Sequence, residues 1–130
     1  MSDPAPAPRR RARITRSGDF DAVYRRGRSS ANRHLVVYAF PRPDAGPGDE
    51  VRLGLSVSRK VGGAVERNRV KRVLRERFRE IADDLRPGTD LVVIARPGVA
   101  EYIEQRGSAA VAERLRELAL KVAPREGPST

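Results

Sequence analysis

The stretch VRLGLSVSRKVGGAVERNRVKRVLRERFRE, residues 51–80, contains two different hydrophobic periods. Over residues 51–58, apolar residues alternate strictly with small or polar ones, which predicts a half-buried β-strand. One face of this strand holds Val51, Leu53, Leu55 and Val57, and the other holds Arg52, Gly54, Ser56 and Ser58. A glycine-containing connection follows and leads into a helical pattern. The stretch therefore predicts a strand, a turn and a helix, in that order.

The helix is expected over about residues 65–85, because apolar residues recur there at intervals of three and four. These residues form one stripe that should face the core: Val70, Val73, Leu74, Phe78, Ile81, Ala82 and Leu85. The rest of the helix is strongly basic. Residues 66–80 carry seven Arg and Lys side chains against three Glu.

The basic residues of this helix are candidates for nucleic-acid binding. Arg67, Lys71 and Arg75 are spaced by four, so they lie along one side and repel one another unless an anionic partner is present. The further candidates on this helix are Asn68, Arg69 and Arg72. The positive end of the helix dipole adds to the attraction for phosphate. The alternative is a solvated helix face held together by pairs such as Arg72–Glu76.

Four further elements are predicted from the remaining sequence. Residues 17–27 should form a short helix, and residues 33–40, rich in β-branched and aromatic side chains, should form a strand. The strands 33–40 and 51–58 are expected to pair as an antiparallel hairpin. Residues 91–97 are a continuous apolar run, which predicts a strand buried on both faces. A last helix is expected over 107–123, with Val111, Leu115, Leu118, Ala119 and Val122 facing inward.

The predicted order of elements is α-β-β-α-β-α. This order fits an α/β (α+β) two-layer sandwich, in which helices pack on a small sheet. Residues 1–8 are rich in Pro and Ala and are expected to be a disordered lead. Residues 9–123 should form a single domain that binds nucleic acid, and residues 124–130 a loose tail.

The composition restricts the classes of function. The net charge of the chain is +10, and a folded domain this basic most often binds a polyanion. Arg is used far more than Lys, and its planar guanidinium suits phosphates and bases. The chain has no Cys and one His, His34, which argues against thiolate metal sites, a His-based zinc site and a catalytic triad. No apolar run is long enough to span a membrane and no secretory signal is present, so a cytoplasmic location is expected.

Aromatic side chains interleaved with Arg suit single-stranded nucleic acid, whose bases stack on rings. The candidates are Phe20, Tyr24, Tyr38 and Phe40. For Phe40 and Phe78, packing in the core is the favoured alternative. The small residues of strand 51–58 would let another chain approach the sheet closely, although simple exposure to solvent explains them equally well. No group of carboxylates, hydroxyls and His resembles an active site.

The segment GLSVSRKVGGAVERNRVKRVLRERFRE, residues 54–80, strongly resembles the protein subunit of bacterial ribonuclease P. It follows the family pattern, in which a G-L-x-V-S strand precedes an R-N-R helix, nearly position by position. The upstream segment RSGDFDAVYRRGRSSANRHLVVY and the downstream segment DLVVIARPG also resemble that family. The likeness covers about residues 9–121. The departures are the lead at 1–8, the pair Gly62–Gly63 and the tail after 123.

The resemblance implies a fold, a partner and an activity. The family fold is an α/β sandwich with a left-handed βαβ crossover. Its partner is a catalytic RNA, which uses Mg²⁺ to remove the 5′ leader from precursor tRNA. The Mg²⁺ is expected on the RNA and not at a protein site, and the protein is expected to lower the Mg²⁺ requirement. The protein contributes no catalytic residue, and neither DNA nor a membrane is an expected partner.

The resemblance also implies a role for individual residues. The residues that should bind the RNA subunit are Arg67, Asn68, Arg69, Lys71, Arg72 and Arg75. The residues that should bind the leader, in a cleft between the first helix and the sheet, are Phe20, Tyr24, Tyr38, Ser56, Ser58, Arg59 and Lys60.

Three other functions compete with this interpretation. A ribosomal RNA-binding protein would share the size, the charge and a related fold. A DNA-binding regulator would place the 65–85 helix in a major groove, but no helix-turn-helix partner precedes that helix. A protein-only nuclease is the weakest, because no clustered carboxylates or His residues would hold its metal ions.

Overall fold

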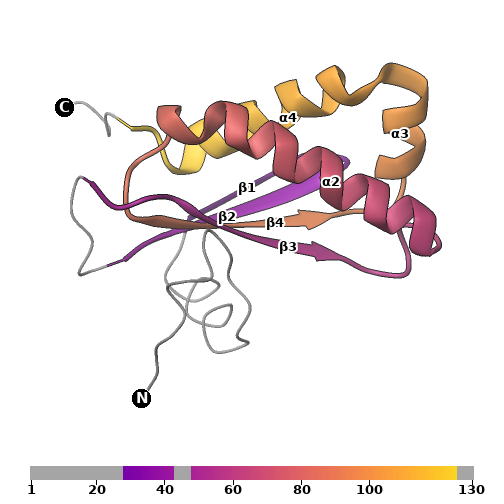
Figure 1. Cartoon of the computed structure of the whole chain (residues 1–130), viewed down its shortest axis with the longest axis horizontal. Coiled ribbons are helices and arrows are strands. Elements are labelled where there is room, and N and C mark those ends of the chain that lie inside the picture. The colour runs from indigo at the N-terminus through magenta and orange to yellow at the C-terminus, as the bar shows by residue number, and fades with distance from the viewer. Residues whose placement is uncertain (1–27, 43–47, 126–130) are drawn as a thin grey trace, which may run out of the picture.

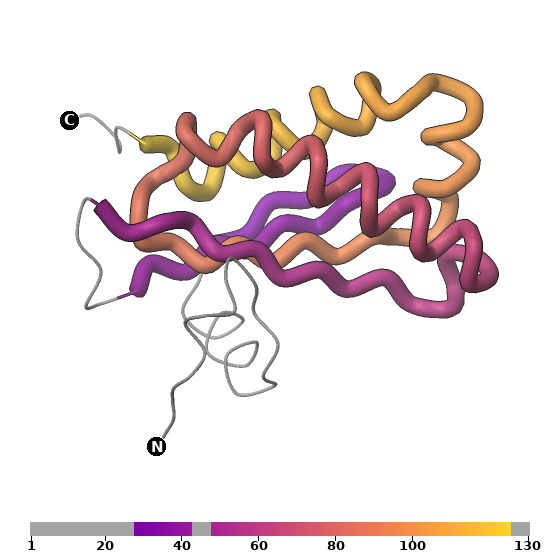
Figure 2. The backbone as a smooth tube through the Cα atoms, in the orientation of Figure 1, coloured from indigo at the N-terminus to yellow at the C-terminus, as the bar shows by residue number. Residues whose placement is uncertain are grey.

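The computed structural model describes residues 28–42 and 48–125, and in these residues four strands form one sheet. Helices cover one face of the sheet, so the protein has two layers (Figures 1 and 2). The strands are β1 (Arg28–Ala31), β2 (Leu35–Pro41), β3 (Arg52–Val57) and β4 (Thr89–Ala95). The helices are α2 (Ala64–Ile81), α3 (Val99–Arg106) and α4 (Ser108–Val122), with a short 3-10 turn, η2 (Ala82–Asp84), after α2. The predicted two-layer α/β (α+β) class is confirmed.

The strand β4 lies inside the sheet, whose order is β1-β2-β4-β3. It pairs antiparallel with β2 and parallel with β3, so the sheet is mixed. Every residue of β4 is buried except Ile94, which is half-buried, and this confirms the predicted strand with two buried faces. The expected hairpin between β2 and β3 is wrong. The two strands follow one another in the sequence, but the apolar β4 separates them because it needs a paired neighbour on each edge and cover on both faces.

The connection from β3 to β4 passes through α2 and is left-handed. In Figure 1 the parallel strands β3 and β4 point the same way, and β3 lies nearer the viewer. The helix α2, which follows β3 and precedes β4 in the sequence, lies above the sheet. Connections of this kind are right-handed in about 98% of proteins, so pattern rules alone would choose the opposite hand. The left-handed crossover expected from the resemblance is therefore present.

The main core lies between the helices and one face of the sheet. The sheet contributes alternate residues: Leu35, Val37 and Ala39 from β2, Leu53 from β3, and Leu91, Val93 and Ala95 from β4. The predicted stripes of α2 and α4 are buried against them, and Phe78 packs in this core as expected. Only Ala82, which lies in the 3-10 turn, remains half-buried. The α-helix ends at Ile81, and Leu85 reaches the core from beyond the turn.

Two elements were not predicted. The strand β1 is short and polar, with the sequence RSSA, and shows no apolar alternation because it is largely exposed. The helix α3 is only eight residues long, and Gly107 separates it from α4 with φ of 87°. Such a backbone angle suits glycine and turns the chain between the two helices. The predicted helix 17–27, the lead 1–8 and most of the tail lie outside the described residues.

A charged cluster joins three strands at one end of the sheet. The carboxylate of Asp90, in β4, is almost completely buried and accepts hydrogen bonds from Arg52 Nε and Nη2, each 2.7 Å long. Arg42 Nη1 donates to Asp90 Oδ1 at 2.6 Å, the oxygen that also accepts from Arg52 Nε, and Arg42 Nη2 donates to the carbonyl oxygen of Glu50 at 2.8 Å. Asp90 therefore ties the end of β2 and the start of β3 to the start of β4.

A second cluster holds α3 against the turn between β1 and β2. The rings of His34 and Tyr102 stack with centroids 4.2 Å apart. The turn itself is fixed by Asn32 Oδ1, which accepts hydrogen bonds from the backbone N–H groups of His34 and Leu35. Burial lowers the pKa of His34 below its ordinary 6.5, and the nearby charges of Arg33 and Arg114 lower it further.

Replacing Asp90 by Ala should lower the free energy of unfolding by about 3 kcal/mol, because two partly buried guanidinium groups lose their shared counter-ion. The exposed pair Arg116–Asp84 provides a control, since it also joins two elements at 2.9 Å. Asp84→Ala should cost less than about 1 kcal/mol. Urea unfolding measures both, and equal losses would contradict a structural role for the buried cluster.

The stability of the protein should depend on the protonation of His34. Because the pKa of His34 is lowered in the folded state, the unfolded chain binds a proton more readily. The contribution of His34 is thus complete above about pH 6.5 and is lost as the pH falls below that value. His34→Phe keeps a ring to stack on Tyr102 but cannot titrate. The unfolding free energy of the native protein should therefore fall more steeply from pH 7 to pH 5 than that of the variant, and parallel curves would contradict the prediction.

Candidate nucleic-acid interface

The helix α2 has three sides with different surroundings. One side packs on the sheet through Val70, Val73, Leu74, Phe78 and Ile81. With about 3.6 residues per turn, Arg67, Lys71 and Arg75 lie along one flank of that buried side. All three are half-buried, whereas Asn68 and Arg72 are exposed. We call Arg67, Lys71 and Arg75 the basic flank. Among the described residues, Arg67 Nε is buried without a hydrogen-bond partner, so part of this charge is held against the protein surface.

The opposite flank of α2 faces the other helices. Arg69 Nη2 donates to the carbonyl oxygen of Ala100 at 3.3 Å, and Arg69 Nη1 lies 3.8 Å from the carboxylate of Glu104, both in α3. Arg77 Nη2 donates to Ser108 Oγ, at the start of α4, at 2.7 Å. Arg69 is thus the one predicted RNA-binding residue of α2 that has partners in another element among the described residues. The basic flank accordingly lies on the side of α2 away from α3 and α4.

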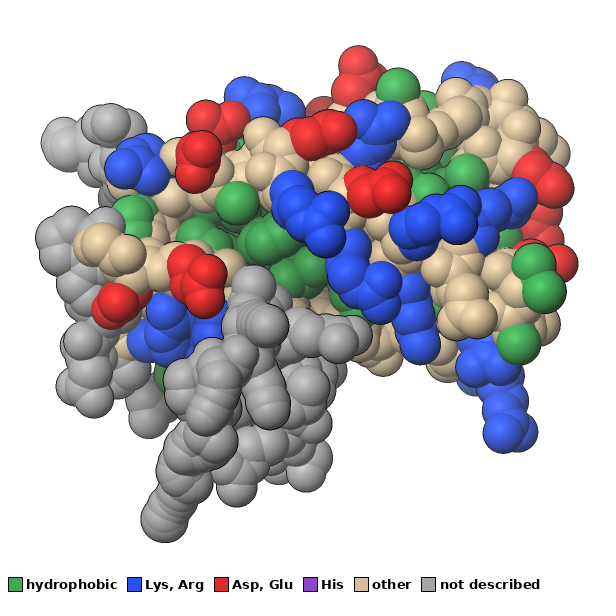
Figure 3. All heavy atoms as spheres, in the orientation of Figure 1, with side chains coloured by type: hydrophobic (Ala, Val, Ile, Leu, Met, Phe, Trp, Pro, Cys, Tyr) green, Lys and Arg blue, Asp and Glu red, His purple; other side chains and the backbone are tan. Residues whose placement is uncertain are grey.

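The basic flank has no acidic partner within the described residues. The pair Arg72–Glu76, which would support a solvated helix face, is not formed, and the ion pair within α2 is Arg77–Glu80 at 3.0 Å. At the start of the helix, Glu66 accepts a hydrogen bond from the Gly63 N–H at 3.1 Å. Figure 3 shows a band of Lys and Arg side chains over α2 and toward β3. This concentration of like charge is the surface expected of a protein that binds a polyanion.

The sheet face that the helices do not cover carries a second predicted set of residues. Cross-strand pairing places Tyr38 of β2, Val92 of β4 and Gly54 of β3 in one row across this face. The next row contains Val36, Ile94 and Ser56. Adjacent rows are about 7 Å apart, since each is two residues along the strands. The predicted Tyr38 and Ser56 therefore share one face, which we call the open face.

An apolar cluster on the open face was only partly predicted. Val92 is fully buried there, and Tyr38, Phe40 and Ile94 pack around it. Phe40 therefore belongs to this cluster and not to the main core. The signal was present in the sequence, because Val36, Tyr38 and Phe40 alternate with the core residues of the same strand.

The other predicted leader-binding residues lie elsewhere. Ser58, Arg59 and Lys60 are exposed in the turn between β3 and α2, where Ser58 Oγ accepts a hydrogen bond from the Lys60 N–H at 3.3 Å. This turn joins the open face, through the edge strand β3, to the basic flank. Phe20 and Tyr24 lie outside the described residues.

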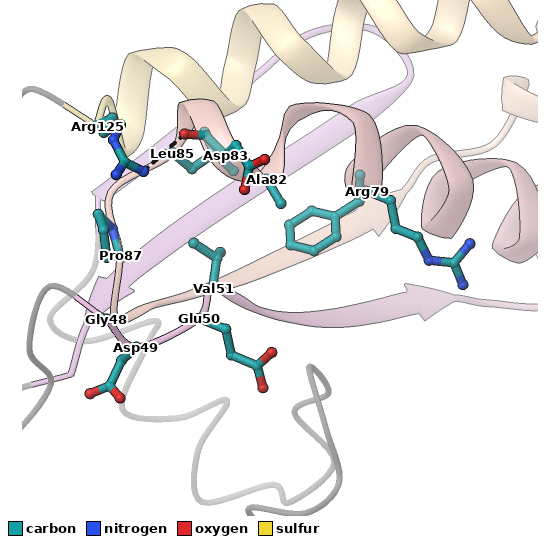
Figure 4. Close-up of a pocket in the computed structure, with 11 residues that line it drawn as sticks. Gly48, Asp49, Glu50, Val51, Arg79, Ala82, Asp83, Leu85, Pro87 and Arg125 are labelled. Atoms are coloured by element: carbon teal, nitrogen blue, oxygen red, sulfur yellow. Dashed lines mark hydrogen bonds between the residues drawn. The ribbon is translucent and has the colours of Figure 1, made fainter.

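A hollow of about 580 Å³ lies at the other end of α2 (Figure 4). Its apolar lining is Val51, Phe78, Ala82, Leu85 and Pro87. The charged residues around it have both signs, and Arg125 donates a hydrogen bond to the carbonyl oxygen of Asp83 at 3.0 Å. In Figure 4 the guanidinium group of Arg79 points away from the hollow. No predicted site residue lines this hollow.

The described residues contain no group of three or more His, Asp or Glu side chains placed to hold a metal ion. In residues 28–42 and 48–125, no helix combines the length and the apolar character needed to cross a membrane. The basic flank, the open face and the turn between them hold the predicted site residues that the structure describes, apart from Asn68, Arg69 and Arg72, which lie elsewhere on α2.

Comparison with known proteins identifies the same family as the sequence pattern. The family model of Ribonuclease P matches residues 9–121. The Ribonuclease P protein component of Geobacillus kaustophilus is 46% identical over 102 residues, which is 77% of this chain and 82% of that protein. The protein component of Bacillus cereus is 42% identical over 93 residues, 72% of this chain and 78% of its own length.

Solved structures agree in fold. The RNase P protein from Thermotoga maritima superimposes with a TM-score of 0.74 at 34% identity, covering 86% of this chain and 98% of that one. An RNase P protein from Staphylococcus aureus gives a TM-score of 0.66 at 34% identity, covering 83% and 97%. The chain therefore belongs to the Ribonuclease P family of protein components, the accessory subunits of the endoribonuclease that processes the 5′ ends of precursor tRNAs.

Proposed function

We propose that this protein binds the RNase P RNA through α2 and the 5′ leader of precursor tRNA on the open face of its sheet. The observation that carries the proposal is the division of charge on α2. One flank makes contacts with α3 and α4, while the basic flank has no acidic partner among the described residues. Unpaired cations on a rigid helix gain most from phosphates, because binding releases the counterions of the RNA.

The residues proposed to contact the RNA subunit directly are Arg67, Asn68, Lys71, Arg72 and Arg75. Arg69 takes part indirectly, because its guanidinium group contacts α3. It holds α3 against the beginning of α2 and so sets the shape of that end of the molecule. Arg69 is therefore a positioning residue and the other five are contact residues, a difference that the sequence alone does not show.

The open face suits a single-stranded leader. Tyr38 offers a half-buried ring, and the neighbouring Phe40, Val36 and Ile94 make the surface apolar. On β3, Gly54 and Ser56 are small, with Gly54 buried and Ser56 half-buried, and the exposed Arg59 and Lys60 follow the end of that strand. Stacking on a ring accepts every base, so this surface would grip a leader with little sequence preference.

The protein's contribution to cleavage is binding and positive potential. Mg²⁺ ions on the RNA subunit would activate the attacking water and stabilise the leaving oxygen. The basic flank neutralises phosphates that otherwise need cations, so less free Mg²⁺ holds the complex together. A cytoplasmic location follows from this function. A DNA-reading role is not supported, because α2 follows a strand and a glycine turn instead of a partner helix.

Replacing Tyr38 by Ala should weaken the holoenzyme's binding of precursor tRNA about tenfold and leave binding of mature tRNA nearly unchanged, because only the precursor has a leader to stack on the ring. Tyr38→Phe should bind like the native protein. Tyr102→Ala is a control, because this ring belongs to α3, stacks on His34 and packs against the main core, not on the open face. Affinities of both tRNAs for reconstituted holoenzyme measure the effect, and equal losses for the two tRNAs with Tyr38→Ala would refute the leader site.

Replacing Lys71 or Arg75 by Gln should weaken the affinity for RNase P RNA, and the plot of log affinity against log salt should become shallower by about one unit for each cation. Arg69→Gln should lower the thermal stability and leave the salt slope nearly unchanged, because its partners are in α3. Binding titrations at several salt concentrations separate the two classes. A slope that changes with Arg69→Gln and not with Lys71→Gln would reverse the assignment.

A further inference from the structure

Val65 is the large hydrophobic side chain that the described part of the chain leaves exposed, with 79% of its surface accessible. It lies in the first turn of α2, outside the stripe that packs on the sheet. The other large apolar side chains of α2 are buried. A single exposed apolar residue needs no explanation by itself. The surroundings of Val65 are what make its exposure informative.

Polar and cationic groups surround Val65 at the beginning of α2. Asn68 lies one turn further along the helix on the same side, and Arg72 lies two turns along. Arg69 is also one turn along, but its guanidinium group contacts α3. Arg59 and Lys60 are exposed in the turn that precedes the helix. The apolar surface of Val65 therefore lies within the surface proposed to meet RNA, and not on the mixed-charge side formed by α3 and α4.

The local backbone lets a partner approach this side chain. Ala64, next to Val65, is small and exposed, while the Glu66 side chain folds back over Gly62 and Gly63 and accepts a hydrogen bond from the Gly63 N–H. Val is β-branched and holds one strongly preferred side-chain conformation in a helix, so its two methyl groups are presented in a fixed direction. Val65 thus offers a rigid apolar surface beside donors that fix phosphates.

We propose that Val65 is a contact residue for the RNA subunit and packs against the apolar face of a nucleotide, either its ribose or an unstacked base. The inference rests on the proposed function of α2. Phosphate contacts account for affinity that salt weakens, but they do not fix the position of one RNA segment on the helix. The contact of Val65 would be insensitive to salt and would set the register of the RNA against Asn68 and Arg72. RNA is favoured over a protein partner because Arg59, Lys60 and Arg72 lie nearby without an acidic partner among the described residues, while the adjacent Glu66 accepts a hydrogen bond from the Gly63 N–H.

The test is binding of the full-length protein to RNase P RNA transcribed in vitro, measured at several salt concentrations. Val65→Ala removes apolar surface, and Val65→Thr keeps the shape but replaces a methyl group with a hydroxyl. Both should weaken binding by about 3- to 10-fold at every salt concentration, with an unchanged salt slope. Val65→Ile should bind at least as well as the native protein. Arg72→Gln, one of the proposed phosphate contacts, should weaken binding and reduce the slope by about one unit.

The controls separate the failure of this proposal from the failure of the proposed function. Ala109→Ser, at an exposed position of α4, should bind RNA like the native protein. Unchanged binding by Val65→Ala and Val65→Thr, together with weaker binding by Arg72→Gln, would overturn the role of Val65 alone. Unchanged binding by all three would overturn the RNA surface of α2 itself. A lower thermal stability of Val65→Thr, or a loss of self-association in sedimentation with RNA binding intact, would assign Val65 to folding or to a protein contact and overturn the proposal.

Discussion

The strand β4 needs cover on both faces and a neighbour on each edge, and the rest of the structure depends on this requirement. Its residues are apolar on both sides, so it is stable only inside the sheet. Pairing with β3 is parallel, which demands a crossover long enough to return across the sheet. The helix α2 is that crossover. The position of the strongly basic helix α2 is therefore a consequence of the burial of the apolar strand β4.

The crossover determines which charges remain available. The helices α3 and α4 pack against one flank of α2. On this flank Arg69 donates a hydrogen bond to the carbonyl oxygen of Ala100, and Arg77 donates one to Ser108 Oγ. Among the described residues, no acidic side chain pairs with the other flank, so the charges of Arg67, Lys71 and Arg75 are not neutralised there. The same segment thus serves the core, the helix–helix contacts and the RNA surface. The role of each residue depends on the direction around the helix axis in which its side chain points.

The strand β4 is buried on both faces of the sheet, although the helices of the described residues cover only one of them. Val92 is fully buried on the open face, with Tyr38, Phe40 and Ile94 around it. Asp90 closes the end of the same face by binding two arginines. An apolar surface between a charged cluster and an exposed basic turn suits a flexible anionic chain, because rings accept the bases while cations accept the phosphates.

The sequence by itself determined the local elements and the chemistry of the partner. Alternation in 51–58, the apolar run near 91–97 and the stripe from Val70 to Leu85 each report a local period, which depends only on neighbouring residues. The charge of the segment 66–80 likewise indicated a nucleic-acid partner, and the resemblance of residues 54–80 to the ribonuclease P protein subunit indicated RNA. The short elements β1 and α3 were not predicted, because neither has a clear hydrophobic period. The strand β1 depends on its pairing with β2, and α3 is set apart from α4 by the turn at Gly107.

Only the tertiary structure decided which strands are neighbours, the hand of the crossover and the partner of each arginine. The sequence places β2 next to β3, but the insertion of β4 between them depends on long-range pairing that no local period encodes. Arg69 and Lys71 look alike in the sequence, and they differ because α3 packs against one flank of α2 and not the other. The exposure of Val65 likewise depends on the tertiary structure, because the sequence alone does not show which sides of α2 are packed against other elements.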